Sequence, residues 1–192
     1  MIAPRAAVSE NCDFCHASLS AVHQHVLELS TRKLACACEA CAVLFSGEYQ
    51  KYRRVPRRIL FLPDFQITDA QWDSLMVPIG IVFFFHSSAA NRVVALYPSP
   101  AGPVESLLPL ESWEEIAAQN PQLQSMAPDV EGLLAYRAAP VREYYILPID
   151  ECFRLIGIIR LNWKGFSGGT AMRQEIGKFL ETLKQKCGLS KV

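Results

Sequence analysis

The feature that most constrains this chain is a pair of Cys-x-x-Cys motifs near its start. Cys12 and Cys15 form the first motif, and Cys38 and Cys41 form the second. Each motif can point two sulfurs at one place, so two motifs supply the four thiolate ligands of a tetrahedral metal site. Four protein ligands leave no open position for a reacting water, which is typical of a structural site. The sequence therefore predicts one structural metal ion, with zinc favoured.

The residues around these motifs predict a small module. Residues 22–29 and 32–37 are expected to form a hairpin between the two motifs. Residues 42–45 predict a short helical turn that ends at Gly47. A knuckle, a hairpin and a second knuckle at a helix start is the order of a treble-clef or zinc-ribbon-like module. We expect metal binding to supply much of its folding energy, because so short a segment has little core of its own.

Two other metal centres fit part of the pattern. Cys12, Cys15 and His16 also spell C-x-x-C-H, the attachment motif of c-type haem. Haem attachment would require export, and it would leave the second cysteine pair unexplained. Iron bound to the same four sulfurs, as in a rubredoxin-like centre, would make the protein an electron carrier. Tetrahedral sulfur sites do not distinguish zinc from iron by sequence, so iron remains the alternative cofactor.

Additional ligands are available close to the four cysteines. Cys36 alternates with Cys38 on an extended segment, so both are expected to face the same side. Cys36 could replace Cys38 or lie near the metal as a spare thiol, although a buried small residue is the simpler interpretation. His16 is the other possible extra ligand. His23 and His25 share a strand face, where histidines are more often half-exposed residues than ligands.

The remainder of the chain predicts an α+β domain. Strands are expected at residues 57–62, 79–85, 93–97, 130–136, 143–147 and 153–161, and helices at 68–76, 113–119 and 170–186. The last two strands are expected to form a hairpin around Asp150 and Glu151, and the prolines at 98–103 a rigid loop. Regular crossover helices are missing, which favours an antiparallel or mixed sheet. The final helix is amphipathic. We therefore expect a metal module over residues 1–58 and an α+β domain over 59–192.

A basic run follows the metal module within a polar stretch, residues 49–58, that resembles a linker. The run contains Lys51, Arg53, Arg54, Arg57 and Arg58. Such a flank can bind phosphates or steer an acidic protein partner. Lys and Arg total 19, as do Asp and Glu, so the net charge is zero. A dedicated nucleic-acid binder would carry a basic excess, so a protein partner or a solvated linker is favoured.

The chain is expected to be cytoplasmic and to lack a membrane span. Its start has no long apolar segment of the secretory type. The longest apolar run, residues 77–85, is far shorter than the roughly 20 residues that a membrane span needs. Seven cysteines in a reducing compartment point to metal binding or buried thiols rather than to disulfides.

No catalytic constellation is evident. Residues 165–169 fit the G-x-S-x-G motif of a hydrolase nucleophile elbow, with Ser167 as the nucleophile. The base of that triad follows the serine in the chain, and no histidine occurs after His86. Asp150 and Glu151 would face opposite sides of a strand, which makes them a poor carboxylate pair. The sequence reveals no reaction, and a binding role is favoured over an enzyme.

Three segments carry a resemblance to a known family: LACACEACAVLF at 34–45, FFFHSSAANRVVALYPSPAG at 83–102 and PIDECFRLIGIIR at 148–160. They resemble an uncharacterised bacterial family whose genes tend to lie beside those of high-affinity uptake nickel–iron hydrogenases and their maturation factors. The resemblance spans nearly the whole chain. It implies an accessory role in assembly, maturation or the complex itself, with a hydrogenase subunit or maturation factor as partner. It supplies no catalytic residues. His16 departs from it, because glycine is expected there in many relatives.

Overall fold

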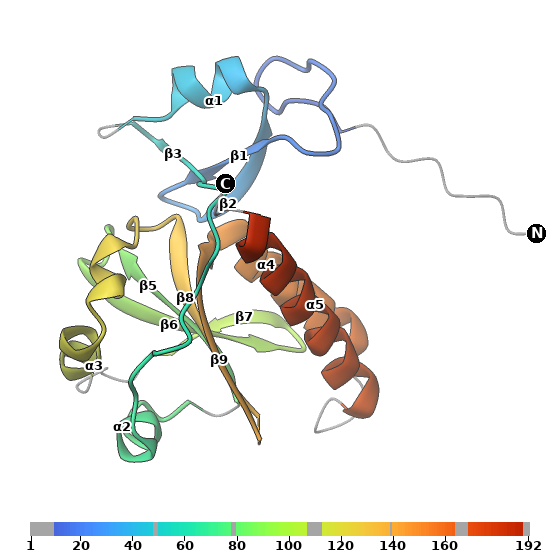
Figure 1. Ribbon diagram of the computed structural model, residues 1–192. Coiled ribbons are helices and arrows are strands. Elements are labelled where there is room, and N and C mark those ends of the chain that lie inside the picture. Colours follow the sequence, from blue (N-terminus) through green and yellow to red (C-terminus); the bar gives the residue numbers. More distant parts are fainter. Residues whose placement is uncertain are drawn as a thin grey trace, which may run out of the picture. The chain divides into compact units, whose positions relative to one another are not determined.

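The chain folds into two compact units, Met1–Val55 and Pro56–Val192, each with its own antiparallel sheet (Figure 1). The computed structural model describes residues 10–47, 50–77, 80–106, 113–138, 140–163 and 169–189. Within these ranges every strand pair is antiparallel. The expected α+β class with a C-terminal helix is therefore confirmed.

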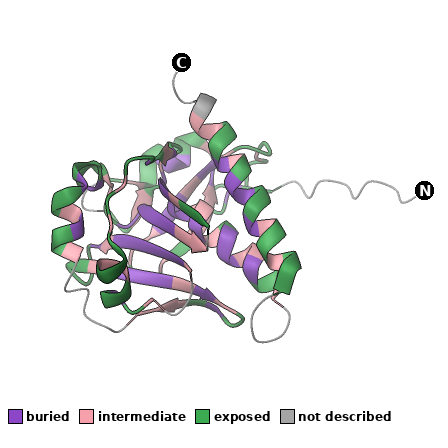
Figure 2. Cartoon of the chain, turned by 60° about the horizontal axis from the view of Figure 1, so that its bottom comes forward, coloured by how far each residue is buried: buried purple, intermediate pink, exposed green. Residues whose placement is uncertain are grey.

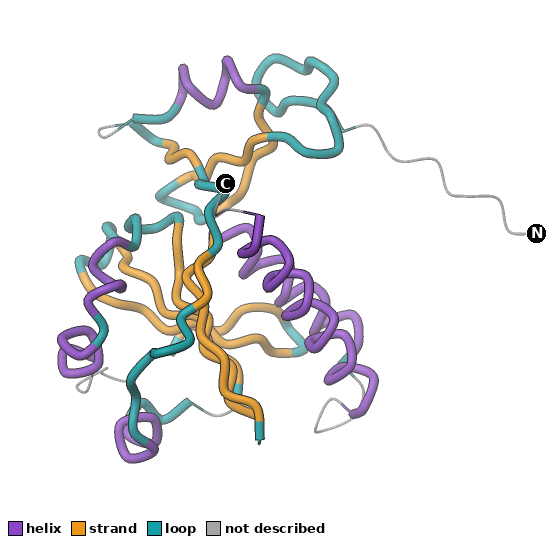
Figure 3. Tube along the Cα trace, in the orientation of Figure 1, coloured by secondary structure: helices purple, strands orange, loops and turns teal. Residues whose placement is uncertain are grey.

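The first unit contains a three-stranded sheet of order β2-β1-β3 and one short helix (Figure 3). Its elements are β1 (Gln24–Glu28), β2 (Lys33–Ala37), α1 (Glu39–Phe45) and β3 (Tyr52–Arg54). The expected hairpin between the cysteine motifs is present as β1 and β2. Arg32 takes a positive φ of 55° in its turn, a conformation that type I′ and bulged hairpin turns require.

The basic stretch is not wholly a linker, which corrects the sequence-based expectation. Tyr52–Arg54 forms β3 and pairs with the free edge of β1, where Val26 lies opposite Arg54. The polar composition of this stretch did not predict a strand. β3 forms because its backbone hydrogen-bonds to β1, and it has no apolar pattern of its own. Pairing with a strand about 25 residues earlier is a tertiary effect that local sequence does not report.

The second unit is built on a six-stranded sheet of order β4-β9-β8-β5-β6-β7. Its strands are β4 (Leu60–Phe61), β5 (Ile81–Ser87), β6 (Arg92–Ser99), β7 (Gly102–Glu105), β8 (Glu131–Ala138) and β9 (Val141–Pro148). Helices cover both faces, which places the centre of the sheet in the interior (Figure 2). Phe83, Phe84 and Phe85 are accordingly all buried. Burial on both faces explains why β5 is a continuous apolar run rather than an alternating one.

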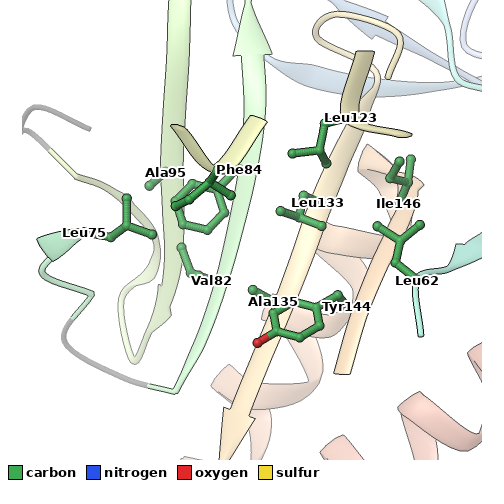
Figure 4. Close-up of a cluster of buried hydrophobic side chains, with 11 residues drawn as sticks. Leu62, Leu75, Val82, Phe84, Ala95, Leu123, Leu133, Ala135, Tyr144 and Ile146 are labelled. Atoms are coloured by element: carbon green, nitrogen blue, oxygen red, sulfur yellow. The ribbon is translucent and has the colours of Figure 1, made fainter. Parts of the chain in front are cut away.

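The short helices α2 (Asp69–Ser74) and α3 (Trp113–Gln119), with the 3-10 turn Pro121–Ser125, belong to one face of this sheet. Side chains from the sheet, α3 and the flanking segments form a single apolar cluster on that side (Figure 4). Two pairs of aromatic rings pack against each other in this cluster. Phe84 lies 5.0 Å from Trp113 and Phe65 stacks 4.5 Å from Tyr144, measured between ring centroids. Thr68 caps α2 through a reciprocal capping box with Gln71.

The opposite face is covered by α4 (Ile149–Asn162) and α5 (Gly169–Leu189), which pack together (Figure 1). The expected strand at residues 153–161 and its hairpin around Asp150 and Glu151 are wrong. The buried residues Ile149, Cys152, Leu155, Ile156 and Ile159 follow a helical period. Asp150 and Glu151 occupy the first turn of α4, where acidic side chains interact favourably with the helix dipole. The isoleucine-rich composition suggested a strand, but the helical spacing of the buried residues, which pack against the sheet, favours a helix.

The proline-rich residues 98–103 form a tight hairpin rather than a loop, which is a third correction. β6 runs through Pro98 to Ser99, and β7 starts at Gly102, which has a φ of 120°. Pro98 and Pro103 lie opposite each other in the register. β7 is an edge strand, so the absent N–H of Pro103 leaves no ladder hydrogen bond unmade.

We expect Gly80→Ala to destabilise the second unit. A Cβ at Gly80 would lie 2.4 Å from the backbone oxygen of Arg137, so β5 and β8 would have to separate. The expected cost is about 1–3 kcal/mol. Gly157→Ala is the matched control, because a Cβ there meets nothing within 4 Å and helix propensity should stabilise α4 by about 0.5–1 kcal/mol. Urea denaturation measures both, and equal midpoints would contradict the close approach.

Candidate metal centre

The sulfurs of Cys12, Cys15, Cys38 and Cys41 lie within 4.8 Å of one another, and we call this group the four-cysteine cluster. Cys15 Sγ is 3.7 Å from Cys38 Sγ. Four sulfurs around a tetrahedral ion with metal–sulfur bonds of the zinc length would lie about 3.8 Å apart. No disulfide forms, since all seven cysteines of the chain are free. The cluster could therefore hold a metal ion.

The first knuckle is a tight backbone turn closed by two hydrogen bonds. The Cys12 N–H donates to the Ala17 oxygen at 2.8 Å, and the His16 N–H donates to the Cys12 oxygen at 2.9 Å. His16 completes the turn with a φ of 60°. Glycine would take this conformation without steric cost. The turn directs Cys12 inward and leaves Cys15 exposed.

The second knuckle is the start of α1. Cys38 is the N-cap of that helix, and its sulfur accepts a hydrogen bond from the Cys41 N–H at 3.5 Å. The first helical turn is closed by the Ala42 N–H, which donates to the Cys38 oxygen at 2.9 Å. The cap bond fixes the position of the Cys38 sulfur at the start of α1.

The cluster is electrostatically uneven without a cation. Burial alone would raise the pKa of Cys12, but hydrogen bonds from the backbone of Cys38, Cys15 and Phe14 and from the Cys15 thiol lower it to about 6. Burial, together with hydrogen bonds to the other three sulfurs and the charge of Cys12, raises the pKa of Cys41 to about 12. Ionisation of the Cys12 thiol is therefore favoured, and ionisation of the Cys41 thiol is opposed. A bound cation would relieve this opposition by compensating the negative charges.

A small apolar shell surrounds the cluster. Cys12 and Cys41 are buried together with Val26, Ala37 and Ala42. Phe14, in the first knuckle, stacks on Phe45 at a centroid distance of 4.8 Å. The same ring meets the edge of Tyr52 at 5.2 Å, which connects the knuckle to β3. Two of the five buried residues are candidate ligands, so this core is small without a metal.

The other suggested ligands lie outside the four-cysteine cluster. His16 is exposed and does not belong to it. β2 ends at Ala37 and Cys38 is a helix cap, so strand alternation does not bring Cys36 to the side of Cys38 as expected. Cys36 instead joins His23 and His25 in a second group of potential ligands. Sequence reasoning noted that both histidines share a face but did not connect them with Cys36.

The five residues of the basic run are divided between the two units, since the boundary follows Val55. Lys51 pairs with Glu28 at 2.6 Å, and Arg54 contacts Glu39 and Gln24. In the second unit, Arg58 binds the buried carboxylate of Glu131. Much of the basic charge is therefore neutralised by acidic partners distant in sequence, which the linear run did not reveal.

One described pocket of about 350 Å³ lies in the second unit, and sequence analysis did not identify it. It is lined by Asp69, Trp72, Asp73, Arg137, Val141 and Arg142. Asp69 forms ion pairs with both Arg142 and Arg137. Hydrogen bonds from Arg142, and to a smaller extent from Arg137, lower the pKa of Asp69. The Arg137 guanidinium also lies 4.9 Å from the centre of the Trp72 ring. Strand pairing between β8 and β9 places Arg137 opposite Arg142, and α2 contributes Asp69 and Trp72, so no local motif predicts the pocket.

Ser167 and its G-x-S-x-G motif lie largely outside the described residues. Among the helices that the structure describes, none combines the length and apolar character needed to cross a membrane.

Fold and site together define an α+β protein with antiparallel sheets and a compact four-cysteine cluster near the N-terminus. The chain belongs to a family of unknown function, DUF5947, which matches residues 11–187. No curated protein and no solved structure matches the chain.

Proposed function

We propose that the four-cysteine cluster binds one structural zinc ion, and that the protein is an accessory factor of a nickel–iron hydrogenase system that acts by protein–protein binding. The observation that carries the metal assignment is the convergence of four sulfurs within 4.8 Å. Four thiolates complete a tetrahedral coordination sphere, so the ion would stabilise the fold rather than take part in a reaction. The resemblance of three segments to a hydrogenase-associated family supports the choice of partner.

The metal assignment is tested by elemental analysis and the visible spectrum of the purified chain. Zinc has a filled d shell, so a zinc protein is colourless, whereas iron bound to four thiolates is coloured. One equivalent of zinc and no visible absorption are expected. A red protein with one equivalent of iron would replace the proposal by electron transfer from the hydrogenase.

The exposed side of α1 is the proposed docking surface. Val43 and Leu44 are 63% and 67% exposed, although both are large and apolar. They lie two and three residues after Cys41 on the same helix, so a metal-bound knuckle would hold them rigidly. Rigid apolar side chains that remain exposed are suited to act as anchors in a partner's pocket, since their ordering costs little on binding. Phe45, stacked on Phe14, borders this surface.

We expect Leu44→Glu to abolish docking without unfolding the protein. Loss of a central anchor typically costs about 2 kcal/mol or more, which weakens binding more than tenfold. Leu161→Glu is the matched control, because Leu161 is 84% exposed on α4 of the other unit. Co-purification from a host that expresses the hydrogenase measures the effect: the wild-type chain and Leu161→Glu should retain a hydrogenase subunit or maturation factor.

Hydrogenase activity in a deletion strain is the companion measurement. We expect it to fall when the gene is deleted and to recover with Leu161→Glu but not with Leu44→Glu. Normal activity in the deletion strain, with no co-purifying hydrogenase component, would refute the accessory role. Folding of the Leu44→Glu chain is confirmed beforehand by an unchanged metal content.

The basic flank, residues 51–58, has a secondary part in this proposal. Lys51, Arg53 and Arg54 lie on the unit that carries α1, and they would steer an acidic partner towards it. Lys51 and Arg54 already have acidic partners, so their contribution is to the association rate rather than to affinity. Reversing the charge of Arg53 should slow association at low salt only, because salt screens exposed charges.

A further inference from the structure

A second group of metal-binding side chains lies on the hairpin of the first unit. The ligand atoms of His23, His25 and Cys36 lie within 4.8 Å of one another, and we call this group the histidine–cysteine cluster. His25 and Cys36 are directly opposite each other in the register of β1 and β2. His23 precedes His25 by two residues, and the two rings meet edge to face at a centroid distance of 4.9 Å. The cluster is thus built on paired backbone.

The protonation of His23 leaves a ligand atom facing a carboxylate. The Nδ1 atom of His23 lies 3.0 Å from the backbone carbonyl oxygen of Ser20. A carbonyl oxygen can only accept a hydrogen bond, so Nδ1 carries the proton. The neutral ring then has its lone pair on Nε2. That atom is buried, and no residue in the described ranges forms a hydrogen bond with it. Glu10 Oε2 lies 3.4 Å away, so two electron-rich atoms face each other. They require either a second proton on the ring or a cation between them.

The surroundings favour the cation. The His23 side chain is only 6% exposed, so the Nδ1 bond to Ser20 fixes its orientation in the way that metal-bound histidines are held by an outer hydrogen bond. Cys36 is held by its own backbone N–H, which donates to Asp13 Oδ2 at 2.6 Å. Two imidazoles and a thiol that converge on one point, with a carboxylate beside them, match the donor preferences of zinc and its neighbours.

We propose that His23, His25 and Cys36 bind a second divalent transition-metal ion of the zinc class, with the Glu10 carboxylate as its nearest oxygen donor. The His23 ring is almost fully buried, whereas the residues His25 and Cys36 are half-buried, so the ion can enter and exchange from their side. Three protein ligands leave a position for a carboxylate, water or incoming ligand. This site differs from the closed four-cysteine cluster in donor set and in access. It does not depend on the proposed hydrogenase role.

Cobalt(II) titration of the full-length chain, followed by its visible spectrum and by elemental analysis, tests the proposal. Cobalt replaces zinc and reports its ligands through absorption bands, with thiolate charge-transfer bands that strengthen with the number of sulfurs. The wild-type chain should bind two cobalt ions with distinct spectra. His23→Ala and Cys36→Ser should each bind one and keep the strong four-sulfur bands, which also shows that the unit remains folded.

His16→Asn is the control, because it removes an exposed histidine outside both clusters and asparagine tolerates the positive φ there. It should still bind two ions. A single cobalt ion in the wild-type chain would overturn the proposal and leave a protonated His23 paired with Glu10. Two ions in both His23→Ala and Cys36→Ser would overturn it equally, since the second ion would then lie elsewhere. If the cobalt-loaded wild-type chain shows no four-sulfur bands, that result would instead contradict the structural zinc site.

Discussion

Cys38→Ser is expected to unfold the first unit and to leave the second unit folded. Zinc binding to structural sites of this kind contributes about 10–16 kcal/mol at neutral pH, and much of that is folding free energy. The remaining core around the four-cysteine cluster is small, and Cys12 and Cys41 are themselves part of it. Cys38 also caps α1, so the substitution removes one ligand while a serine oxygen keeps the cap. The effect therefore reports on metal binding rather than on the helix end.

Amide hydrogen exchange and metal analysis measure this result. Protection of the β1 and β2 amides should disappear, while protection of β5 and β8 in the second unit should persist. Treating the wild-type chain with a chelator should produce the same pattern. Cys187→Ser is the control, because this half-buried cysteine belongs to α5 and to neither cluster. Unchanged metal content in Cys38→Ser would show that the ligand assignment is wrong.

The second large effect is expected from Arg58→Met, which should destabilise the second unit by about 3 kcal/mol or more. Its partner Glu131 has a side chain that is 0% exposed. Arg58 binds both carboxylate oxygens, at 2.6 Å from Nε and 2.7 Å from Nη2, and the Ala127 N–H adds a third bond at 2.7 Å. Removing the guanidinium would leave a buried charge with one backbone donor. The half-exposed position of Arg58 lets water enter, so we expect the lower end of the range for a broken buried pair.

A double-mutant cycle separates this penalty from lost packing. Glu131→Gln with Arg58→Met should cost much less than the sum of the two single substitutions, because the charge is then absent. Arg92→Met is the matched control, since the exposed pair of Arg92 and Glu105, at 3.2 Å, should contribute less than about 1 kcal/mol. Urea denaturation of each variant gives the free energies of unfolding. Equal losses for Arg58→Met and Arg92→Met would contradict the buried ion pair. The result also decides whether Arg58 is structural or available to a partner.

Local patterns predicted much of this architecture correctly. The short helix α2, the amphipathic spacing of α5 and the hairpin β1–β2 each depend on residues within a few positions of one another. The errors at α4 and β3 have a common origin. An isoleucine-rich segment is compatible with a strand or a helix, and a polar segment with a linker or an edge strand. Only packing against a sheet in the first case, and pairing with a free strand edge in the second, decides between them.

The sequence by itself predicted the four-cysteine cluster, because each of two short motifs brings two sulfurs together through the local geometry of a turn. The hairpin β1–β2 between the motifs then brings the two pairs together. The sequence did not determine the metal. Tertiary structure alone decided which side chains meet from distant positions. The register of β1 and β2 places Cys36 opposite His25, and the fold brings Arg58 to Glu131, 73 residues later. Such pairings depend on how strands align and on which carboxylate becomes buried. Both are properties of the whole packed unit, which no local spacing encodes.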